Sequence, residues 1–225
     1  MARQASVSRD TTAPTLVSNV RKVNKDTWYR RDIFDFFSKI SNPFYSVTFN
    51  VDVTEAYAYA KRSGLSFYYA LVYLVTKAIN SVEAFRYGIV DGELVLFDKR
   101  SPSFTDLKKS SESFHIVTMP CVGDMADFCF DAKRRSTEQT TFLSVDKEGA
   151  DLIYISCLPW VELTALTNER DFDPDDAIPR ISWGKYYERD GRKILGMSLE
   201  LNHRFTDGVH IGKFAEALEN LISEL

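Results

Sequence analysis

A strand pattern changes to a helix pattern at Leu201-Asn202-His203-Arg204-Phe205-Thr206-Asp207-Gly208, close to the end of the chain. Apolar and polar residues alternate up to this stretch, and after it Phe214, Leu218 and Ile222 recur at helical spacing. Such a junction holds a side chain at a fixed depth, and histidine has the unperturbed pKa closest to neutral pH. His203 is therefore a candidate general base.

Asp207 allows three roles at this junction. It could orient the His203 imidazole, cap the helix that follows, or pair with a cation elsewhere in the chain. A metal site is a further possibility, because His203, Asp207 and His210 are four and three residues apart and would align on one helix. The strand pattern runs to about Asn202, however, and Gly208 interrupts the set, so the spacing disfavours a metal.

Ser156 is the candidate nucleophile for a triad with a histidine. It stands between an apolar strand pattern and Pro159, and the Gly-x-Ser-x-Gly turn that presents such serines does not surround it. Taken alone, the residues favour a serine bonded to the backbone over a nucleophile.

The composition is that of one globular domain. The 225 residues are 44% hydrophobic and 27% charged, and no linker rich in Pro, Gly or Ser divides residues 20–225. We expect a disordered leader over residues 1–20 and a single domain over residues 21–225. The net charge of −4 argues against nucleic acid as a partner.

Cysteine usage and hydropathy indicate the compartment. The three cysteines are odd in number and lack Cys-x-x-Cys spacing, which favours a reduced, cytoplasmic protein over a disulfide framework or a zinc site. The most apolar run, residues 65–79, is shorter than the ~20 residues of a membrane span. The first residues lack the apolar core of a secretory signal. We therefore expect a cytoplasmic protein that does not enter a membrane.

Helix and strand patterns are mixed along the chain without strict alternation. We expect helices over residues 26–41, 54–62, 66–82 and 125–133 and from Asp207 onward. Extended segments are expected over residues 46–53, 103–105, 113–118, 152–157, 160–166, 181–188 and 193–201, with a hairpin over residues 87–97 that turns at Asp91-Gly92. This mixture favours an α+β fold, an α/β two-layer sandwich with a mixed β-sheet, over a doubly wound parallel sheet.

Six segments in the same order resemble the chloramphenicol acetyltransferase family, and together they span about residues 24–224. The stretch Asn202-His203-x-x-x-Asp207-Gly208 resembles that family's His-His-x-x-x-Asp-Gly signature. The other segments that carry the resemblance are residues 28–34, 85–95, 155–161, 184–186 and 207–212.

The resemblance implies a CoA-dependent acyltransferase fold and a homotrimer with active sites between subunits. The implied reaction is acetyl transfer from acetyl-CoA to a hydroxyl of chloramphenicol, which confers resistance to the antibiotic. His203 would be the general base, and Ser156 of the facing subunit would donate a hydrogen bond to the oxyanion. Asp207 would form an ion pair with Arg30 that holds the turn over residues 203–206, here called the histidine turn.

Substrate and cofactor contacts are implied in the same way. The side chains expected at the substrate are Phe37, Tyr45, Phe104 and Ser182. Tyr186 would contact CoA, and the reaction requires no metal.

The chain departs from the family's pattern at several positions. Asn202 replaces the first histidine of the signature, and Pro43 and Asp106 alter the segments beside the acceptor. Two alternatives therefore stay open. The first is the same chemistry on another small alcohol, and the second is a non-catalytic protein that binds CoA or a drug.

Overall fold

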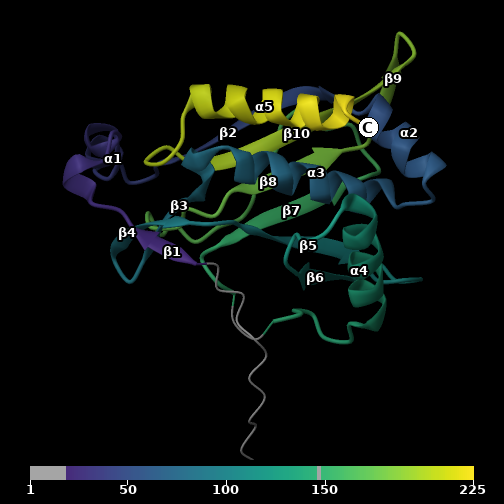
Figure 1. The fold of residues 1–225 in the computed structure, drawn as a ribbon, viewed down its shortest axis with the longest axis horizontal. Helices are drawn as coiled ribbons and strands as arrows, with labels where there is room; N and C mark the ends of the chain where they lie inside the picture. The colour runs from purple at the N-terminus through teal and green to yellow at the C-terminus, as the bar shows by residue number, and fades with distance from the viewer. Residues whose placement is uncertain (1–18, 146–147) are drawn as a thin grey trace, which may run out of the picture.

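A computed structural model describes residues 19–145 and 148–225, which form two β-sheets and a set of helices (Figure 1). The large sheet has the strand order β2-β10-β8-β7-β5-β6, and β9 also pairs with β10. Its strands are β2 (Phe44–Asp52), β5 (Ser101–Leu107), β6 (Phe114–Thr118), β7 (Leu152–Leu158), β8 (Arg180–Gly184), β9 (Tyr187–Arg189) and β10 (Arg192–Asn202). Strand β7 is parallel to β5 and β8, and the other pairs are antiparallel. The expected α+β class with a mixed sheet is confirmed.

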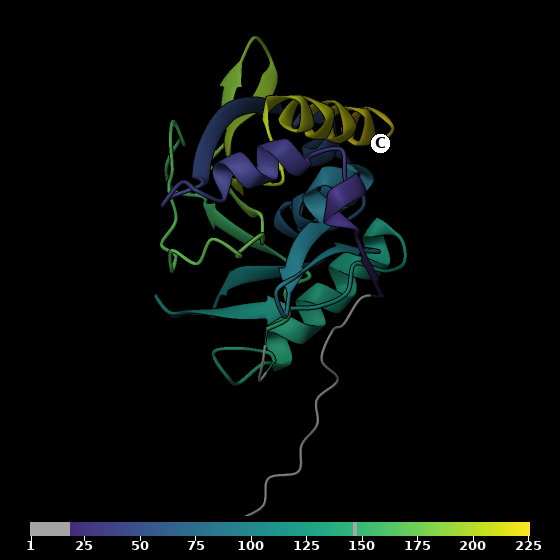
Figure 2. The same ribbon diagram turned by 90° about the vertical axis from the view of Figure 1, so that its left-hand side faces the viewer.

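Helices cover one face of the large sheet. Helices α3 (Phe67–Ser81) and α5 (Gly208–Ser223) pack against each other over its strands, and α4 (Met125–Glu138) lies beside β6 (Figures 1 and 2). The shorter helices are α1 (Arg31–Phe37) and α2 (Thr54–Arg62), with the 3-10 helices η1 (Lys25–Thr27) and η2 (Glu83–Arg86). Residues 159–179, which contain neither helix nor strand, cross the other face of the sheet (Figure 2).

Strand alternation decides what each face of the large sheet touches. On β10, Leu195, Met197 and Leu199 are fully buried in the core under the helices. Ser198 and Glu200 face the other way and bond to residues 159–179. Since side chains alternate between the two faces of a strand, the face away from the helices collects the polar side chains of the central strands.

A small sheet, with the strand order β1-β4-β3, lies beside α1. Its strands are β1 (Val20–Lys22), β3 (Tyr87–Val90) and β4 (Glu93–Phe97). The predicted hairpin is confirmed, because Asp91 and Gly92 have φ of 52° and 76° and join β3 to β4. A second core cluster links this sheet to the histidine turn; it contains Trp28, Phe34, Tyr87, Leu94, Leu96 and Phe205.

Several predicted helix boundaries are confirmed. Helix α2 has the predicted bounds, and Ser66 caps α3 by accepting a hydrogen bond from the Tyr69 N–H. Asp207 is the N-cap of α5. Helix α4 begins where expected but continues to Glu138, five residues beyond the expected end.

The predicted helix from Asp26 is wrong in its start and its end. Asn24 caps the short η1, Trp28 is extended, and α1 occupies only Arg31–Phe37. The Trp28 side chain is 6% exposed, with its ring centroid 4.9 Å from that of Tyr87. Burial of this ring in the second core cluster overrides the local helical pattern.

The expected leader is only partly described. Residues 1–18 lie outside the described residues, so the expectation of disorder there stays a prediction. Val20, which the sequence assigns to the leader, is the first residue of β1 and pairs with Phe97. The ordered domain therefore begins slightly earlier than residue 21.

The predicted strand over residues 160–166 is wrong. This segment runs across the sheet instead of pairing with a strand: a Cβ on Gly184 would lie 2.6 Å from Leu163 N, and one on Gly196 would lie 1.9 Å from Leu163 O. Apolar residues here pack onto glycine backbone, so their hydrophobicity does not report a strand.

Candidate active site

His203 is the first residue after β10, in the turn that leads to α5. Its backbone N–H donates to Pro43 O at 2.8 Å. Its ring stacks on Phe37, with centroids 4.0 Å apart and planes 8° apart, and lies 4.6 Å from the ring of Tyr45. The structure therefore brings two of the predicted substrate contacts, from α1 and β2, directly against the candidate base.

The two ring nitrogens of His203 differ in their surroundings. Nδ1 is buried and makes no hydrogen bond to any of the described residues, whereas the residue as a whole is partly exposed. Nε2 is the nitrogen that remains accessible to a substrate.

Asp207 joins the histidine turn to the N-terminal part of the chain. Its Oδ2 accepts a hydrogen bond from Arg30 Nη1 at 2.7 Å, and its Oδ1 accepts from Val209 N at 3.2 Å. The Arg30 side chain is 2% exposed and that of Asp207 27%. Burial would raise the pKa of Asp207, but the hydrogen bond and the charge of Arg30 and the Val209 N–H lower it. Asp207 is thus both a helix cap and one member of a largely buried ion pair.

His210 completes the cap of α5. Its Nδ1 lies 3.1 Å from the Asp207 N–H and 3.0 Å from Asp207 Oδ1. Burial lowers the pKa of His210, although the Asp207 charge opposes this. The neutral ring with an unprotonated Nδ1 accepts from the backbone N–H, and we favour this arrangement over a charged pair with the carboxylate.

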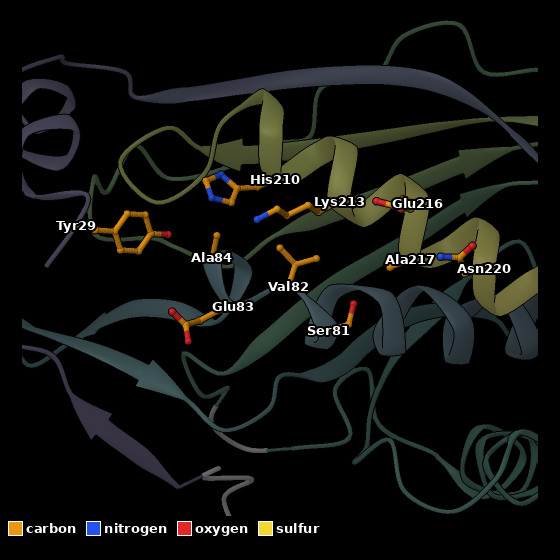
Figure 3. A pocket seen from close by; sticks show the side chains of 10 residues that line it. All are labelled: Tyr29, Ser81, Val82, Glu83, Ala84, His210, Lys213, Glu216, Ala217 and Asn220. Carbon is orange, nitrogen blue, oxygen red and sulfur yellow. The ribbon is translucent and has the colours of Figure 1, made fainter.

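His210 also lines a cavity of about 550 Å³ between α5 and the end of α3 (Figure 3). Tyr29, Glu83 and Lys213 contribute to its wall. The predicted site residues are not among those that line it. The cavity therefore lies behind the histidine turn, on the side of the helices.

A larger cavity, about 890 Å³, lies on the polar face of the large sheet. Ser156 on β7 and Ser182 on β8 contribute to its wall, together with Asp106, Tyr154 and Trp160. The lining side chain of Cys157 is a thiol, because burial raises its pKa to about 12. The cavity thus offers hydroxyl and aromatic groups, and its cysteine is not a reactive thiolate.

The structure does not bring His203 and Ser156 together within one chain. Ser156 pairs with Ser182 and Ser182 with Ser198, while His203 lies five positions (203 − 198) further along the chain. With strands about 4.8 Å apart and a rise of about 3.3 Å per residue, the two residues are roughly 20 Å apart. At this distance, His203 and Ser156 of the same chain cannot both contact the reacting groups of one substrate.

The prediction that Phe104 contacts the substrate needs correction. Phe104 is fully buried among the core residues, with its ring centroid 6.0 Å from that of Tyr69. Its neighbours Ser103 and Thr105 line the large cavity instead. Alternation along β5 puts residue 104 on the core face, so its ring lies behind the cavity wall.

Ser182 and Tyr186 lie in different surroundings. Ser182 is 1% exposed, lines the large cavity and donates to Asn168 Oδ1 at 3.5 Å. Tyr186 lies outside that lining, with its ring 5.2 Å from that of Tyr57 and 4.8 Å from Lys193 Nζ. Lys193 Nζ also pairs with Glu188 Oε1 at 2.6 Å.

The sequence did not predict a buried polar network beside the histidine turn, on the polar face of the large sheet. Glu200 accepts from Arg170 Nε at 2.6 Å and from Asn168 N at 2.7 Å, and Arg170 also pairs with Asp176. Glu200 and Asn202 are 5% and 6% exposed. In the sequence they alternate with apolar residues and look like the solvent face of a strand, so periodicity alone gave no signal that residues 168–176 cover them.

Within the described residues, no group of three or more His, Cys, Asp or Glu side chains is placed to hold a metal ion. His203 lies against Phe37 and Tyr45, whereas His210 caps the helix through Asp207. No helix in the described ranges is long and apolar enough to cross a membrane.

Comparison with known proteins identifies relatives along nearly the whole chain. The family model for chloramphenicol acetyltransferase matches residues 18–219. A chloramphenicol acetyltransferase of Staphylococcus aureus is 30% identical over 209 residues, covering 90% of this chain and 95% of that protein. One from Clostridium perfringens is 28% identical over 206 residues, covering 90% and 98%.

Solved structures agree with these relatives. A chloramphenicol acetyltransferase structure superposes with a TM-score of 0.81 and 25% identity, covering 91% of this chain and all of the other. A dihydrolipoamide acetyltransferase of Azotobacter vinelandii has a TM-score of 0.64 at 16% identity, covering 86% of each chain, which shows a shared fold.

Proposed function

The chain belongs to the chloramphenicol acetyltransferase family and is an acyltransferase, and from this premise we propose that it acetylates a hydroxyl of chloramphenicol with acetyl-CoA. The active enzyme is a homotrimer in which His203 of one subunit meets the large cavity of the next. Acetylation of the drug confers resistance. Three free cysteines support a cytoplasmic location, where thiols stay reduced.

The observation that carries the proposal is the setting of His203. Its ring is held between Phe37 and Tyr45 and is partly exposed. A general base needs this combination of fixed orientation and access to the proton it removes. The turn that carries this histidine is held in place by an ion pair and a capping box.

The mechanism follows from these positions. His203 Nε2 takes the proton of the acceptor hydroxyl as its oxygen attacks the thioester carbonyl. The tetrahedral oxyanion accepts a hydrogen bond from Ser156 of the facing subunit. The C–S bond then breaks, the imidazolium returns the proton to the departing thiolate, and the products are the acetyl ester and CoA. Ser156 forms no covalent bond.

The Tyr186 region supports a CoA contact. The rings of Tyr57 and Tyr186 and the ammonium of Lys193 gather beside β9, and Lys61 Nζ lies 5.3 Å from the Tyr57 ring. The aromatic rings suit the adenine and Lys61 suits a phosphate, whereas Lys193 Nζ already pairs with Glu188 Oε1 at 2.6 Å.

Exposed apolar side chains support the shared site. Near His203, Ile33, Phe36 and Ile40 are 39%, 60% and 42% exposed, and beside the large cavity Trp160 and Val161 are 70% and 52% exposed. Apolar groups gathered in this way on a surface are typical of protein interfaces. A trimer that joins the two regions would bury them and bring His203 to Ser156.

The test of the function is an acetyl-transfer assay. Purified protein with acetyl-CoA and chloramphenicol is expected to release free CoA thiol and to yield the acetylated drug, which mass spectrometry identifies. Thiol release no faster than that of His203→Ala protein would contradict the proposal. Turnover with any acceptor would eliminate the alternative of a non-catalytic binding protein.

A second acceptor class is favoured by one observation. The large cavity has carboxylates of Asp106, Glu112, Glu148 and Glu169 in its wall, whereas its Arg180 already pairs with Asp176. Such a wall favours a more polar or basic alcohol than chloramphenicol. Thiol release with a panel of amino alcohols, and none with the drug, would select this alternative.

Mixing two inactive variants tests the shared site. Ser156→Ala is expected to lower kcat by about 10²-fold, because one oxyanion donor is lost, and His203→Ala removes the base. When the two proteins are unfolded and refolded together, about one quarter of the interfaces in random trimers regain both side chains. Recovery of roughly that share of wild-type activity is the expected result. Full loss after mixing, with trimers present by light scattering, would show that no site is shared.

A further inference from the structure

We propose that Asn202 is a positioning residue, which holds the turn that carries His203 by bonding it to residues 174–176 on the polar face of the sheet. The inference rests on the proposed role of His203 as general base. It assigns a function to the side chain that stands where the family's signature has its first histidine.

Asn202 makes hydrogen bonds with every polar atom of its side chain. It is 6% exposed, and its Nδ2 donates to Pro174 O at 2.8 Å and to Asp176 O at 3.0 Å. Its Oδ1 accepts from Arg204 N at 3.0 Å. Only this orientation of the amide satisfies both carbonyls and the N–H, so the assignment of oxygen and nitrogen is determined by the contacts.

Asn202 hydrogen bonds hold the residues that precede and follow His203 in the sequence. The Asn202 side chain fixes Arg204, and the Asn202 carbonyl accepts from Phe205 N at 3.1 Å and Thr206 N at 3.2 Å. The His203 N–H donates to the carbonyl of Pro43, the residue directly before β2, at 2.8 Å. The direction of the imidazole therefore depends on the turn that Asn202 organises.

Residues 174–176, whose carbonyls accept the hydrogen bonds from Asn202, are themselves held by ion pairs. Asp176 pairs with Arg180 at 2.8 Å and Arg170 at 3.4 Å, and Arg204 Nη1 contacts both Pro174 O and the Asp175 carboxylate. Arg170 and Arg204 are almost completely buried. Because Arg180 is on β8 and Arg170 also pairs with Glu200 on β10, Asp176 is tied to the sheet and gives Asn202 a fixed reference for the turn.

The rate effect follows from the geometry that a base requires. A shift of about 1 Å in a catalytic group can cost as much as 10²-fold in rate, because the proton transfer needs a short, aligned contact. Loss of the Asn202 side chain removes three of the hydrogen bonds that hold the turn, and leaves the Arg204 contacts to residues 174 and 175 and the rings of Phe37 and Tyr45 as restraints. We expect the ring to sample orientations in which Nε2 no longer meets the acceptor hydroxyl.

The test compares Asn202→Ala and Asn202→Asp with a matched control, Ser198→Ala. Aspartate keeps the acceptor for Arg204 N but cannot donate to the two carbonyls when ionised. Ser198 is on the same strand and also bonds to residues 159–179, which cover this face of the sheet, through Leu166 O at 3.2 Å. It does not touch the histidine turn. For both Asn202 variants kcat is expected to fall by about tenfold or more, with the KM of each substrate within about twofold of wild type. Ser198→Ala is expected to retain its kcat.

A spectroscopic measurement needs no acceptor. The chain has three histidines, so ¹H–¹³C spectra of histidine-labelled protein give few ring signals, and His203→Ala assigns the one from His203. Stacking on Phe37 shifts this signal by its ring current. In Asn202→Ala we expect the His203 signal to move or split while the His115 signal stays in place, and in Ser198→Ala we expect neither to change. Asn202→His, whose ring N–H can reach one of the carbonyls, is expected to restore part of the kcat and of the His203 signal.

The outcomes separate the two proposals. If His203→Ala abolishes turnover but the Asn202 variants keep wild-type kcat and an unchanged His203 signal, the positioning role is wrong and the proposed function stands. A Ser198→Ala variant that loses as much kcat as Asn202→Ala would also overturn the positioning role. Any loosening of residues 159–179 would then be enough to lower the rate. If His203→Ala retains full activity, both proposals fail.

Discussion

Replacement of His203 by alanine is expected to lower the kcat of acetyl transfer by at least about 10²-fold, the usual contribution of a general base. The hydroxyl proton must leave as the oxygen attacks, and the accessible nitrogen of His203 is the group placed to take it. His203 is only partly buried, so the loss in the free energy of unfolding should be smaller than the increase in the activation free energy. The measurement is kcat and KM with acetyl-CoA and chloramphenicol, with the melting temperature recorded on the same samples.

His115→Gln is the matched control for this experiment. His115 is on β6, where its Nε2 lies 2.9 Å from Ser136 Oγ, and it is remote from the histidine turn. The control should keep its kcat. Equal kcat for His203→Ala and wild type, in a folded protein, would show that another group removes the proton.

Asp207→Ala is expected to lower the free energy of unfolding by about 3–5 kcal/mol, because it leaves the buried Arg30 guanidinium without its partner. Arg30→Ala should cost less, since the Asp207 side chain is 27% exposed and water can solvate the remaining carboxylate, whereas Arg30 is 2% exposed. Both variants should also lose rate, because the ion pair holds the turn that carries His203. Denaturant unfolding and kcat on the same preparations measure the two effects.

Asp207→Asn separates the ion pair from the helix cap. Asparagine is as good an N-cap as aspartate, so it keeps the hydrogen bond to Val209 N while removing the charge. A stability loss close to that of Asp207→Ala would assign the effect to the ion pair. Unchanged melting temperature and kcat in Arg30→Ala would refute the pair as a support of the site.

The same pair has a defined pH dependence. Because the folded state lowers the pKa of Asp207 below its ordinary 3.8, the unfolded chain binds its proton more readily. Its contribution to stability is therefore fully present above pH 3.8 and is lost as the pH falls through the lower, folded pKa. An acid-unfolding curve of Asp207→Asn should lack this component.

Much of the candidate site was accessible from local sequence. The change of period at Asn202, the cap at Asp207 and the Asp91-Gly92 turn were all predicted from residues within a few positions of one another. The pairing of Arg30 with Asp207, 177 residues apart, came only with the family resemblance, because no periodicity links such distant charges. Phe104 was misplaced because the resemblance supplied a residue type at a position, and strand alternation turned its ring into the core.

Near His203, then, local sequence was enough to establish that a strand ends, that a turn follows, and that Asp207 begins a helix. Caps, turns and periodicities act over a few residues, so the chain carries them wherever it folds. The packing of distant segments established the rest: that Glu200, Asn202 and Arg204 are covered by residues 168–176, and that His203 and Ser156 lie roughly 20 Å apart. Which segment covers a sheet face is set by contacts between remote parts of the chain, and these have no signature in the spacing of neighbouring residues.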